Sequence, residues 1–202
     1  MTHSRYVVNN FTNYLLKLGF LSSKTMKNIS HQTSPDKIKL RIAELDDLPA
    51  IVEIYNRAVP SFRSTARTEP VTIEERKTWF QEHNLQKYPI FVAEVDGCVI
   101  AWCSLSVYRP GRPALRFTAE LSYYVDTDFQ RQGIGYKLIN HALNVSPSLG
   151  IKNIIAVLID RNEASRKLLE KLGFQQWGYL PRVLDFFGKE CGEFYYGKRI
   201  AD

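Results

Sequence analysis

The fold of this chain is indicated by the stretch Gln130-Arg131-Gln132-Gly133-Ile134-Gly135, which joins an apolar strand to an amphipathic helix. The strand covers residues 117–125, and the helix begins at Gly133 with apolar side chains recurring on one face. Such a helix start presents unpaired backbone N–H groups and the positive end of the helix dipole. Because glycine lets the backbone approach a bulky anion, the loop predicts a pyrophosphate site, although a simple tight turn explains the glycines equally well.

Two common phosphate-binding motifs are excluded at this loop. The dinucleotide fingerprint needs a third glycine and an acidic residue about twenty residues later. A P-loop needs a Gly-Lys-Ser/Thr sequence, which does not follow Gly135.

Composition indicates an ordinary globular protein of 202 residues, with 45% hydrophobic and 24% charged residues. The three cysteines, Cys98, Cys103 and Cys191, form no CxxC pair, and the four histidines show no metal-ligand spacing. We therefore expect a reducing compartment, the cytoplasm, and no metal. No apolar run approaches the length of a membrane span, so we expect no membrane partner.

The positive charge of the chain is concentrated at its beginning. Residues 1–37 contain five basic residues against Asp36 alone, which gives +4 of the total net charge of +6. The rest of the chain is only weakly basic, and we therefore expect no nucleic-acid partner.

Residues 1–37 also differ in composition, being rich in Ser, Thr and Asn. We interpret them as a flexible N-terminal extension, which could be a tail, a targeting leader or an over-long start with the true initiator at Met26. Residues 38–202 are expected to form one domain.

Within that domain, hydrophobic periodicity, caps and turns predict the order β-α-α-β-β-β-α-β-α-β-β. Thr72 and Glu75 have the spacing of a capping box, and Asp96-Gly97 is a hairpin turn. This order predicts the α/β class, with a central, partly antiparallel sheet. The expected strands and helices cover residues 39–43, 46–58, 90–95, 99–107, 117–125, 133–146, 154–159, 164–172, 176–186 and 193–199, and a further helix begins at Thr72 and contains residues 79–80.

The chain resembles the GNAT superfamily of acyl-CoA N-acetyltransferases over residues 39–200. The resemblance is carried by the loop of residues 130–135, by Asn162 followed by Ser165, and by Leu172-Gly173-Phe174. It implies the GNAT fold, a twisted, largely antiparallel mixed sheet with helices on both faces. Segments 67–72, 88–94 and 118–120 further resemble the phosphinothricin and methionine-sulfoximine acetyltransferases, which act on amino-acid-like amines.

The resemblance implies acetyl-CoA as the co-substrate and direct attack of a small-molecule amine on the thioester. The implied acetyl-CoA contacts are Tyr123, Tyr124, Val125, Arg131, Gln132, Gly133, Ile134, Gly135, Tyr136, Asn162 and Ser165. The sequence leaves open whether the protein forms a homodimer.

Glu120 is the candidate general base, because a carboxylate within so apolar a strand needs a task or a partner. The alternative is a structural salt bridge to Arg112 or Arg116. The resemblance also implies a substrate site of Arg112, Glu120 and Ser122, in which Arg112 pairs with a substrate carboxylate. The alternative for Arg112 is a solvated loop charge.

Two residues depart from the pattern of the family. Leu169 stands where many members carry the Tyr or His that reprotonates the CoA thiolate, and Leu115 replaces an aromatic residue of the substrate loop. Another tyrosine, such as Tyr124, or a water could replace that donor. The pair Trp79-Phe80 is expected to belong to the core, and His141 is expected to pack or to face solvent rather than to act as a base. Rival functions are acetylation of a protein N-terminus or lysine, and CoA binding without turnover.

Overall fold

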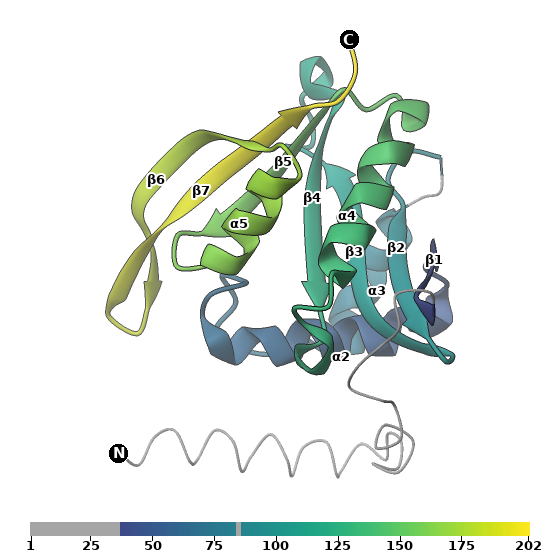
Figure 1. Cartoon of the computed structure of the whole chain (residues 1–202). Coiled ribbons are helices and arrows are strands. Elements are labelled where there is room, and N and C mark those ends of the chain that lie inside the picture. Colours follow the sequence, from purple (N-terminus) through teal and green to yellow (C-terminus); the bar gives the residue numbers. More distant parts are fainter. Residues whose placement is uncertain (1–36, 84–85) are drawn as a thin grey trace, which may run out of the picture. The chain divides into compact units, whose positions relative to one another are not determined.

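The computed structural model describes residues 37–83 and 86–202. In this part of the chain the strands and helices follow the order predicted from the sequence (Figure 1). The helices are α2 (Leu48–Ala58), α3 (Ile73–Glu82), α4 (Ile134–Val145) and α5 (Glu163–Lys171). The strands are β1 (Lys39–Ile42), β2 (Ile90–Val95), β3 (Cys98–Val107), β4 (Thr118–Val125), β5 (Asn153–Ile159), β6 (Gln175–Phe186) and β7 (Lys189–Arg199).

The predictions made for the N-terminal extension lie outside the described residues, apart from Lys37. None of the helices in the described part of the chain is long and apolar enough to span a membrane.

The strands form one sheet in the order β1-β2-β3-β4-β5-β7-β6. Neighbouring strands are antiparallel except β4 and β5, which are parallel. The hairpin between β2 and β3 turns at Asp96 and Gly97, both at positive φ (49° and 81°), as a two-residue turn of this type requires. The predicted mixed, largely antiparallel sheet is therefore confirmed.

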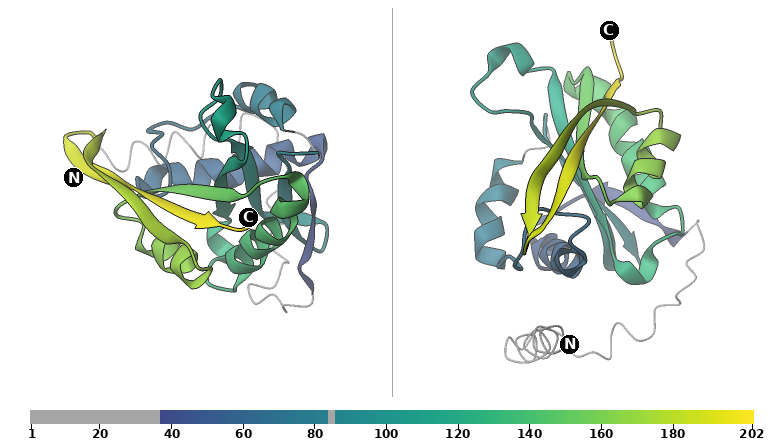
Figure 2. Two further views of the ribbon diagram at one scale, coloured as in Figure 1. Left: turned by 90° about the horizontal axis from the view of Figure 1, so that it is seen from above. Right: turned by 90° about the vertical axis from the view of Figure 1, so that its left-hand side faces the viewer.

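Helices cover both faces of the sheet (Figure 2). Helix α4 packs on β2, β3 and β4 through its apolar stripe, which is buried as its spacing predicts. On the opposite face, α2 packs around Trp102, whose indole Nε1 donates to the Ile51 carbonyl at 3.1 Å. Side chains on one face of β4 therefore point toward α4, and those on the other face point toward α2.

Helix α3 begins at the predicted capping box, in which Thr72 accepts from the Glu75 amide and Glu75 accepts from the Thr72 amide. The prediction that Trp79 and Phe80 belong to the core is only partly right. Both are partly buried and pack against the cluster around Trp102 from outside, and no residue of α3 is fully buried. A short helix at the rim of a sheet can shield the core without entering it.

Candidate active site

A wedge-shaped cavity opens where β4 and β5 separate. The two strands are in register over three residues only, the last pair being Glu120 with Ile155. Beyond that pair each strand stays with its outer neighbour, β4 with β3 and β5 with β7. The wedge encloses a cavity of about 420 Å³, which is within the range of small-ligand sites.

The cavity brings together most of the residues that the sequence assigned to a site. Two segments of the chain, one after β4 and one after β5, meet across it. Of the candidates, Ser122, Tyr123, Tyr124, Val125, Arg131, Gly133, Ile134, Gly135, Tyr136, Asn162 and Ser165 line it. Glu120, Gln132 and Arg112 are not among the lining residues.

The glycine loop forms the wide end of the wedge. Gly133 is the N-cap of α4 at φ 78°, a left-handed conformation that glycine adopts without strain, and no side chain caps the helix. The N–H groups of the first turn therefore remain available to an anion at the positive end of the helix dipole. Gly135 lets α4 approach α5, because a Cβ there would lie 3.1 Å from Leu168 Cδ2.

Arg131 adds positive charge beside these amides. It is a non-glycine residue at φ 60°. A left-handed residue of this kind carries a conformational cost, and such costs cluster at functional sites.

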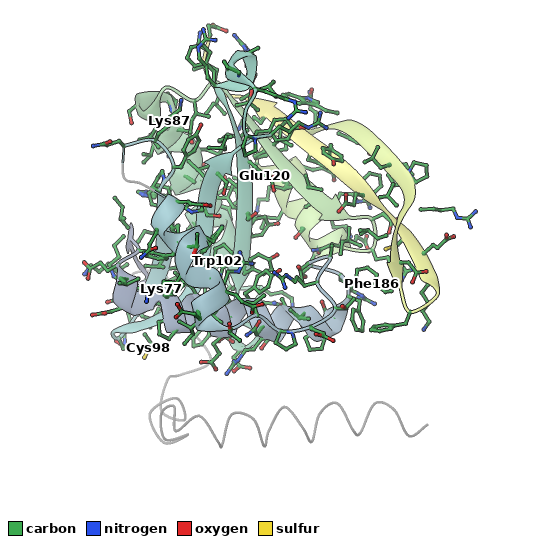
Figure 3. The ribbon with its side chains drawn as sticks, turned by 180° about the vertical axis from the view of Figure 1, so that it is seen from behind. Lys77, Lys87, Cys98, Trp102, Glu120 and Phe186 are labelled. Atoms are coloured by element: carbon green, nitrogen blue, oxygen red, sulfur yellow. The ribbon has the colours of Figure 1, made fainter. Side chains whose placement is uncertain are left out.

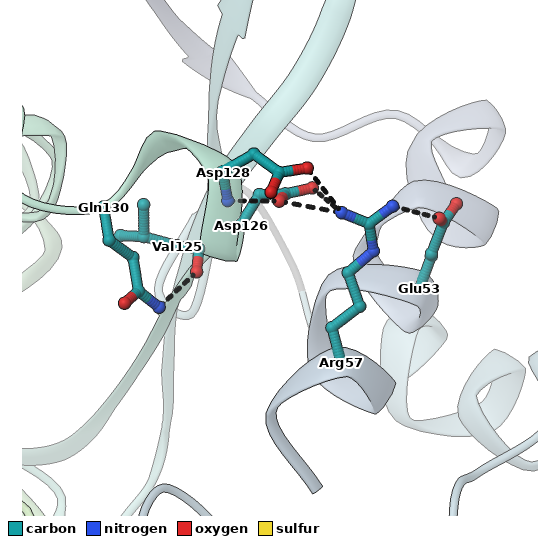
Figure 4. A network of polar contacts seen from close by, with 6 residues as sticks. All are labelled: Glu53, Arg57, Val125, Asp126, Asp128 and Gln130. Carbon is teal, nitrogen blue, oxygen red and sulfur yellow. Dashed lines mark hydrogen bonds and ion pairs between the residues drawn. The ribbon is translucent and has the colours of Figure 1, made fainter. Parts of the chain in front are cut away.

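A partly buried ion-pair network fixes this loop to the rest of the domain (Figure 4). Arg57 Nη1 donates to Asp126 Oδ1 at 2.9 Å and to Asp128 Oδ2 at 3.3 Å, while its Nη2 donates to Glu53 Oε1 at 3.1 Å. The Asp126 carboxylate also accepts from the Asp128 amide at 3.0 Å. Helix α2 therefore holds the segment that carries β4 into the glycine loop.

Asn162 and Ser165 close the wedge from the side of α5. Asn162 is the N-cap of this helix, and its Oδ1 accepts from the Ser165 amide at 3.2 Å. Helix capping explains why an asparagine stands at this position, and it uses only the side-chain oxygen. The Nδ2 group can still donate to a ligand.

Glu120 lies at the closed end of the wedge, on the same face of β4 as Tyr124 and on the face that carries Trp102 (Figure 3). It is partly buried, and among the described residues it forms no salt bridge, so the expected alternative of a pair with Arg112 or Arg116 is wrong. Arg112 is exposed and donates weakly to the Pro110 carbonyl at 3.5 Å, and Arg116 lies over the Phe117 ring. Burial, and secondarily the negative charge of Glu193, raise the pKa of Glu120.

Sequence reasoning missed Glu193, which β7 brings to this face of the sheet. Glu193 is the register partner of Ile159, and burial raises the pKa of its carboxyl group. Strands β4 and β7 lie on either side of β5, and 73 positions separate the two glutamates in the chain. Nothing in the local sequence could indicate that they interact.

A second missed group is His83, at the end of α3. Its Nδ1 lies 2.6 Å from the Trp79 carbonyl, so Nδ1 carries the proton. Its Nε2 therefore accepts from Ser106 Oγ at 3.0 Å, and Ser106 is the register partner of Glu120. Burial lowers the pKa of His83, which favours this neutral form.

The neighbouring tyrosines of β4 point to opposite faces of the sheet. The Tyr124 hydroxyl donates to the Ser64 carbonyl at 3.0 Å, and its ring stacks on Trp102. Tyr123 faces α5 instead, and its hydroxyl oxygen is buried. His141 packs edge-on against Phe91, with ring centroids 4.9 Å apart, as expected for a packing residue.

Comparison with known proteins identifies the class. The model of the acetyltransferase (GNAT) family matches residues 49–174, and the chain therefore belongs to this family. The Bacillus subtilis protein YwnH, provisionally named a phosphinothricin acetyltransferase, is 44% identical over 151 residues, which are 74% of this chain and 91% of that protein. The resemblance stated from the sequence is thus confirmed, and this protein is an acetyltransferase.

Two further relatives bear on the substrates. The L-methionine sulfoximine/L-methionine sulfone acetyltransferase of Pseudomonas aeruginosa is 34% identical over 151 residues, 74% of this chain and 87% of that protein. A crystal structure of a GNAT superfamily phosphinothricin acetyltransferase from Sinorhizobium meliloti, in complex with acetyl-CoA, superposes with a TM-score of 0.77 at 28% identity. The superposition covers 82% of this chain and 89% of the Sinorhizobium meliloti chain. The prediction of acetyl-CoA as co-substrate agrees with that complex.

Proposed function

We propose that this acetyltransferase transfers the acetyl group of acetyl-CoA to the primary amine of a small amino-acid-like molecule, with Glu120 as general base. The position of Glu120 carries the proposal. It stands where the wedge closes, partly buried and without an ion-pair partner among the described residues. Its raised pKa makes it a better proton acceptor for an ammonium group than an exposed glutamate.

Each part of the wedge offers groups that can bind a part of acetyl-CoA. The uncapped first turn of α4 and Arg131 would hold the pyrophosphate. Residues 123–125 have no strand partner on the side of β5, so their backbone groups can pair with the pantetheine amides. Asn162 and Ser165 would contact the pantetheine from the opposite wall.

The chemistry needs no protein nucleophile. The amine nitrogen attacks the thioester carbonyl, a C–N bond forms, and the C–S bond breaks. Glu120 takes the proton that the nitrogen loses, directly or through one water. The wedge would hold the two reactants in line, which lowers the entropic part of the barrier.

The acceptor is proposed from the printed substrates of the relatives and from two side chains. Arg112, on the loop before β4, would pair with the carboxylate of an amino-acid-like acceptor. Ser122 lies on the same face as Glu120 and lines the cavity. We place the enzyme in the cytoplasm, because its three cysteines are all unpaired thiols.

The test is an acetyl-CoA thiol-release assay with L-methionine sulfone, L-methionine sulfoximine, phosphinothricin and free amino acids as acceptors. We expect release with at least one of them. Release only with a lysine-containing or N-terminal peptide would assign the enzyme to protein acetylation. Thermal protection by acetyl-CoA without release from any acceptor would leave a CoA-binding module.

A further inference from the structure

The end of α3 reaches the strand pair that carries Glu120 through one histidine. His83 is the C-cap of this helix, and its Nε2 lies 3.0 Å from the Oγ of Ser106 on β3. Ser106 is the register partner of Glu120, so the two side chains share one face of the sheet, with Cβ atoms about 4.5–5.5 Å apart. The Ser106 hydroxyl is therefore close enough to reach the Glu120 carboxylate by a rotation of either side chain.

The hydrogen bonds of His83 fix the direction of the Ser106 hydroxyl. A carbonyl only accepts hydrogen bonds, and the Trp79 carbonyl lies 2.6 Å from Nδ1, so Nδ1 carries the ring proton. The other nitrogen of the neutral ring is an acceptor, and Ser106 must donate to it. Because a serine hydroxyl has a single proton, Ser106 has none left for Glu120. Accordingly, no described residue donates a hydrogen bond to the Glu120 side chain.

We propose that His83 is a positioning residue, which holds the Ser106 hydroxyl away from Glu120 and so leaves the carboxylate of the base without a donor. The inference rests on the proposed function, in which Glu120 accepts the amine proton. A carboxylate that accepts a hydrogen bond is stabilised in its charged form and is a weaker base. By occupying Ser106, His83 preserves the basicity of Glu120. Ser106 keeps its own proton throughout.

Protonation of His83 reverses this arrangement. An imidazolium carries a proton on both ring nitrogens, so Nε2 donates to the serine and frees its hydroxyl for Glu120. Burial lowers the pKa of His83 and so favours the neutral ring, while the nearby charges on α3 oppose each other, since Glu82 raises this pKa and Arg76 lowers it. Glu193 on β7 is the charged group that acts on Glu120 itself. The arrangement in the structure is therefore the one that operates at neutral pH.

The pKa of Glu120, measured by NMR of its isotope-labelled carboxyl carbon, tests the proposal without any acceptor. His83→Phe keeps an aromatic ring beside Trp79 but removes the hydrogen-bond acceptor, so Ser106 becomes free to donate to Glu120. We expect the pKa of Glu120 to fall by about one unit in this variant. Adding Ser106→Ala removes the donor and should restore the wild-type pKa. Equal values in wild type and His83→Phe, or a fall that persists in the double variant, would overturn the proposal.

The pH dependence of kcat/KM makes the same comparison in the working enzyme. His83→Phe should move the acidic limb to lower pH by about one unit and reduce kcat by about 3-fold, because a weaker base accepts a proton less readily. The double variant should recover both. His141→Phe replaces a histidine that packs against Phe91 from α4, on the other face of the sheet, and should leave the profile unchanged. An acidic limb at the same pH in wild type and His83→Phe would also overturn the proposal.

The ring nitrogens of His83 provide a check that needs no variant. Nitrogen NMR of the wild type should show a protonated Nδ1 and an unprotonated Nε2 at neutral pH. A proton on Nε2 would overturn the proposal even if His83→Phe failed to fold.

The NMR titration also distinguishes this inference from the proposed function. If wild type acetylates no acceptor, the proposed function fails while the titration still reports on His83. If wild type turns over normally and the pKa of Glu120 is the same in wild type and His83→Phe, only the role of His83 fails.

Discussion

Glu120 and Ile155 form the last registered pair between β4 and β5, and the wedge begins immediately beyond them. The candidate base therefore stands at the point where the parallel strands part. Its carboxylate is partly buried, and the next two residues of β4, Leu121 and Ser122, line the cavity.

Replacing Glu120 with glutamine should remove the proton acceptor while preserving the shape of the side chain. We expect kcat to fall by about 100- to 10,000-fold, with acetyl-CoA affinity retained. Steady-state thiol release and calorimetric binding measure the two quantities. An unchanged kcat would rule out Glu120 as the base.

The free energy of unfolding of Glu120→Gln serves as the control for its loss of activity. Because the pKa of Glu120 is raised in the folded state, wild type loses stability as the pH rises from the unfolded pKa through the folded one. Glu120→Gln does not ionise and should show no such loss. Its free energy of unfolding should thus equal or exceed that of wild type at neutral pH, which excludes misfolding as the cause of inactivity.

Glu193 should shift the acidic limb of the pH–rate profile, which follows the ionisation of Glu120. Glu120 acts only when ionised, so kcat/KM falls as the pH drops through its pKa. Removing the negative charge in Glu193→Gln lowers that pKa and should shift the limb to lower pH. Glu190→Gln, on the same strand but paired with Arg182 at the surface, should leave the limb in place. Identical profiles for Glu193→Gln and wild type would contradict the coupling.

The buried arm of the Arg57 network should support the acetyl-CoA loop. Asp126→Ala leaves Arg57 without its most buried partner, and we expect a loss of about 3 kcal/mol in the free energy of unfolding. The Kd of acetyl-CoA should rise as well, because Asp126 also fixes the Asp128 amide. Glu53→Ala removes a more exposed arm of the network and should cost less than about 1 kcal/mol. Chemical denaturation and calorimetry test both, and equal effects would refute the distinction.

Gly133 should matter for binding and not only for backbone strain. Alanine at φ 78° costs about 1 kcal/mol, and Gly150→Ala at φ 73° should cost the same. Neither added Cβ meets protein atoms within 4 Å. Only Gly133→Ala places that carbon beside the proposed pyrophosphate, so only it should raise the Kd of acetyl-CoA. A similar Kd in both variants would argue against the anion site.

Arg112 should affect the acceptor and not the acetyl donor. If it pairs with a carboxylate, Arg112→Ala should raise KM for an amino-acid acceptor by about 10- to 100-fold, with KM for acetyl-CoA unchanged. Lys39→Ala removes the same charge from β1, an edge strand that is separated from β4 by two strands, and serves as the control. An acceptor KM that is the same in wild type and Arg112→Ala would leave Arg112 as a solvated loop charge.

Local patterns predicted much of this fold. The capping box at Thr72, the turn at Asp96-Gly97 and the glycine N-cap of α4 all formed where the sequence placed them, because each depends on neighbours within a few residues. The candidate cofactor residues gathered for the same reason, since they follow two successive strand–loop–helix units. The partial burial of Trp79 was not predictable, because it depends on how far α3 sits from the sheet.

The sequence by itself determined the order of elements, the glycine loop and the choice of Glu120 as a candidate, since these depend on short-range patterns and on residue type. Only the tertiary structure decided that β4 and β5 separate after Glu120, that burial and secondarily Glu193 raise the pKa of Glu120, and that the hydroxyl of Tyr124 donates to the Ser64 carbonyl while that of Tyr123 is buried. These features arise from strand register and from burial between elements that are distant in the chain. Neither is encoded in any local stretch, because both exist only once the whole sheet has assembled.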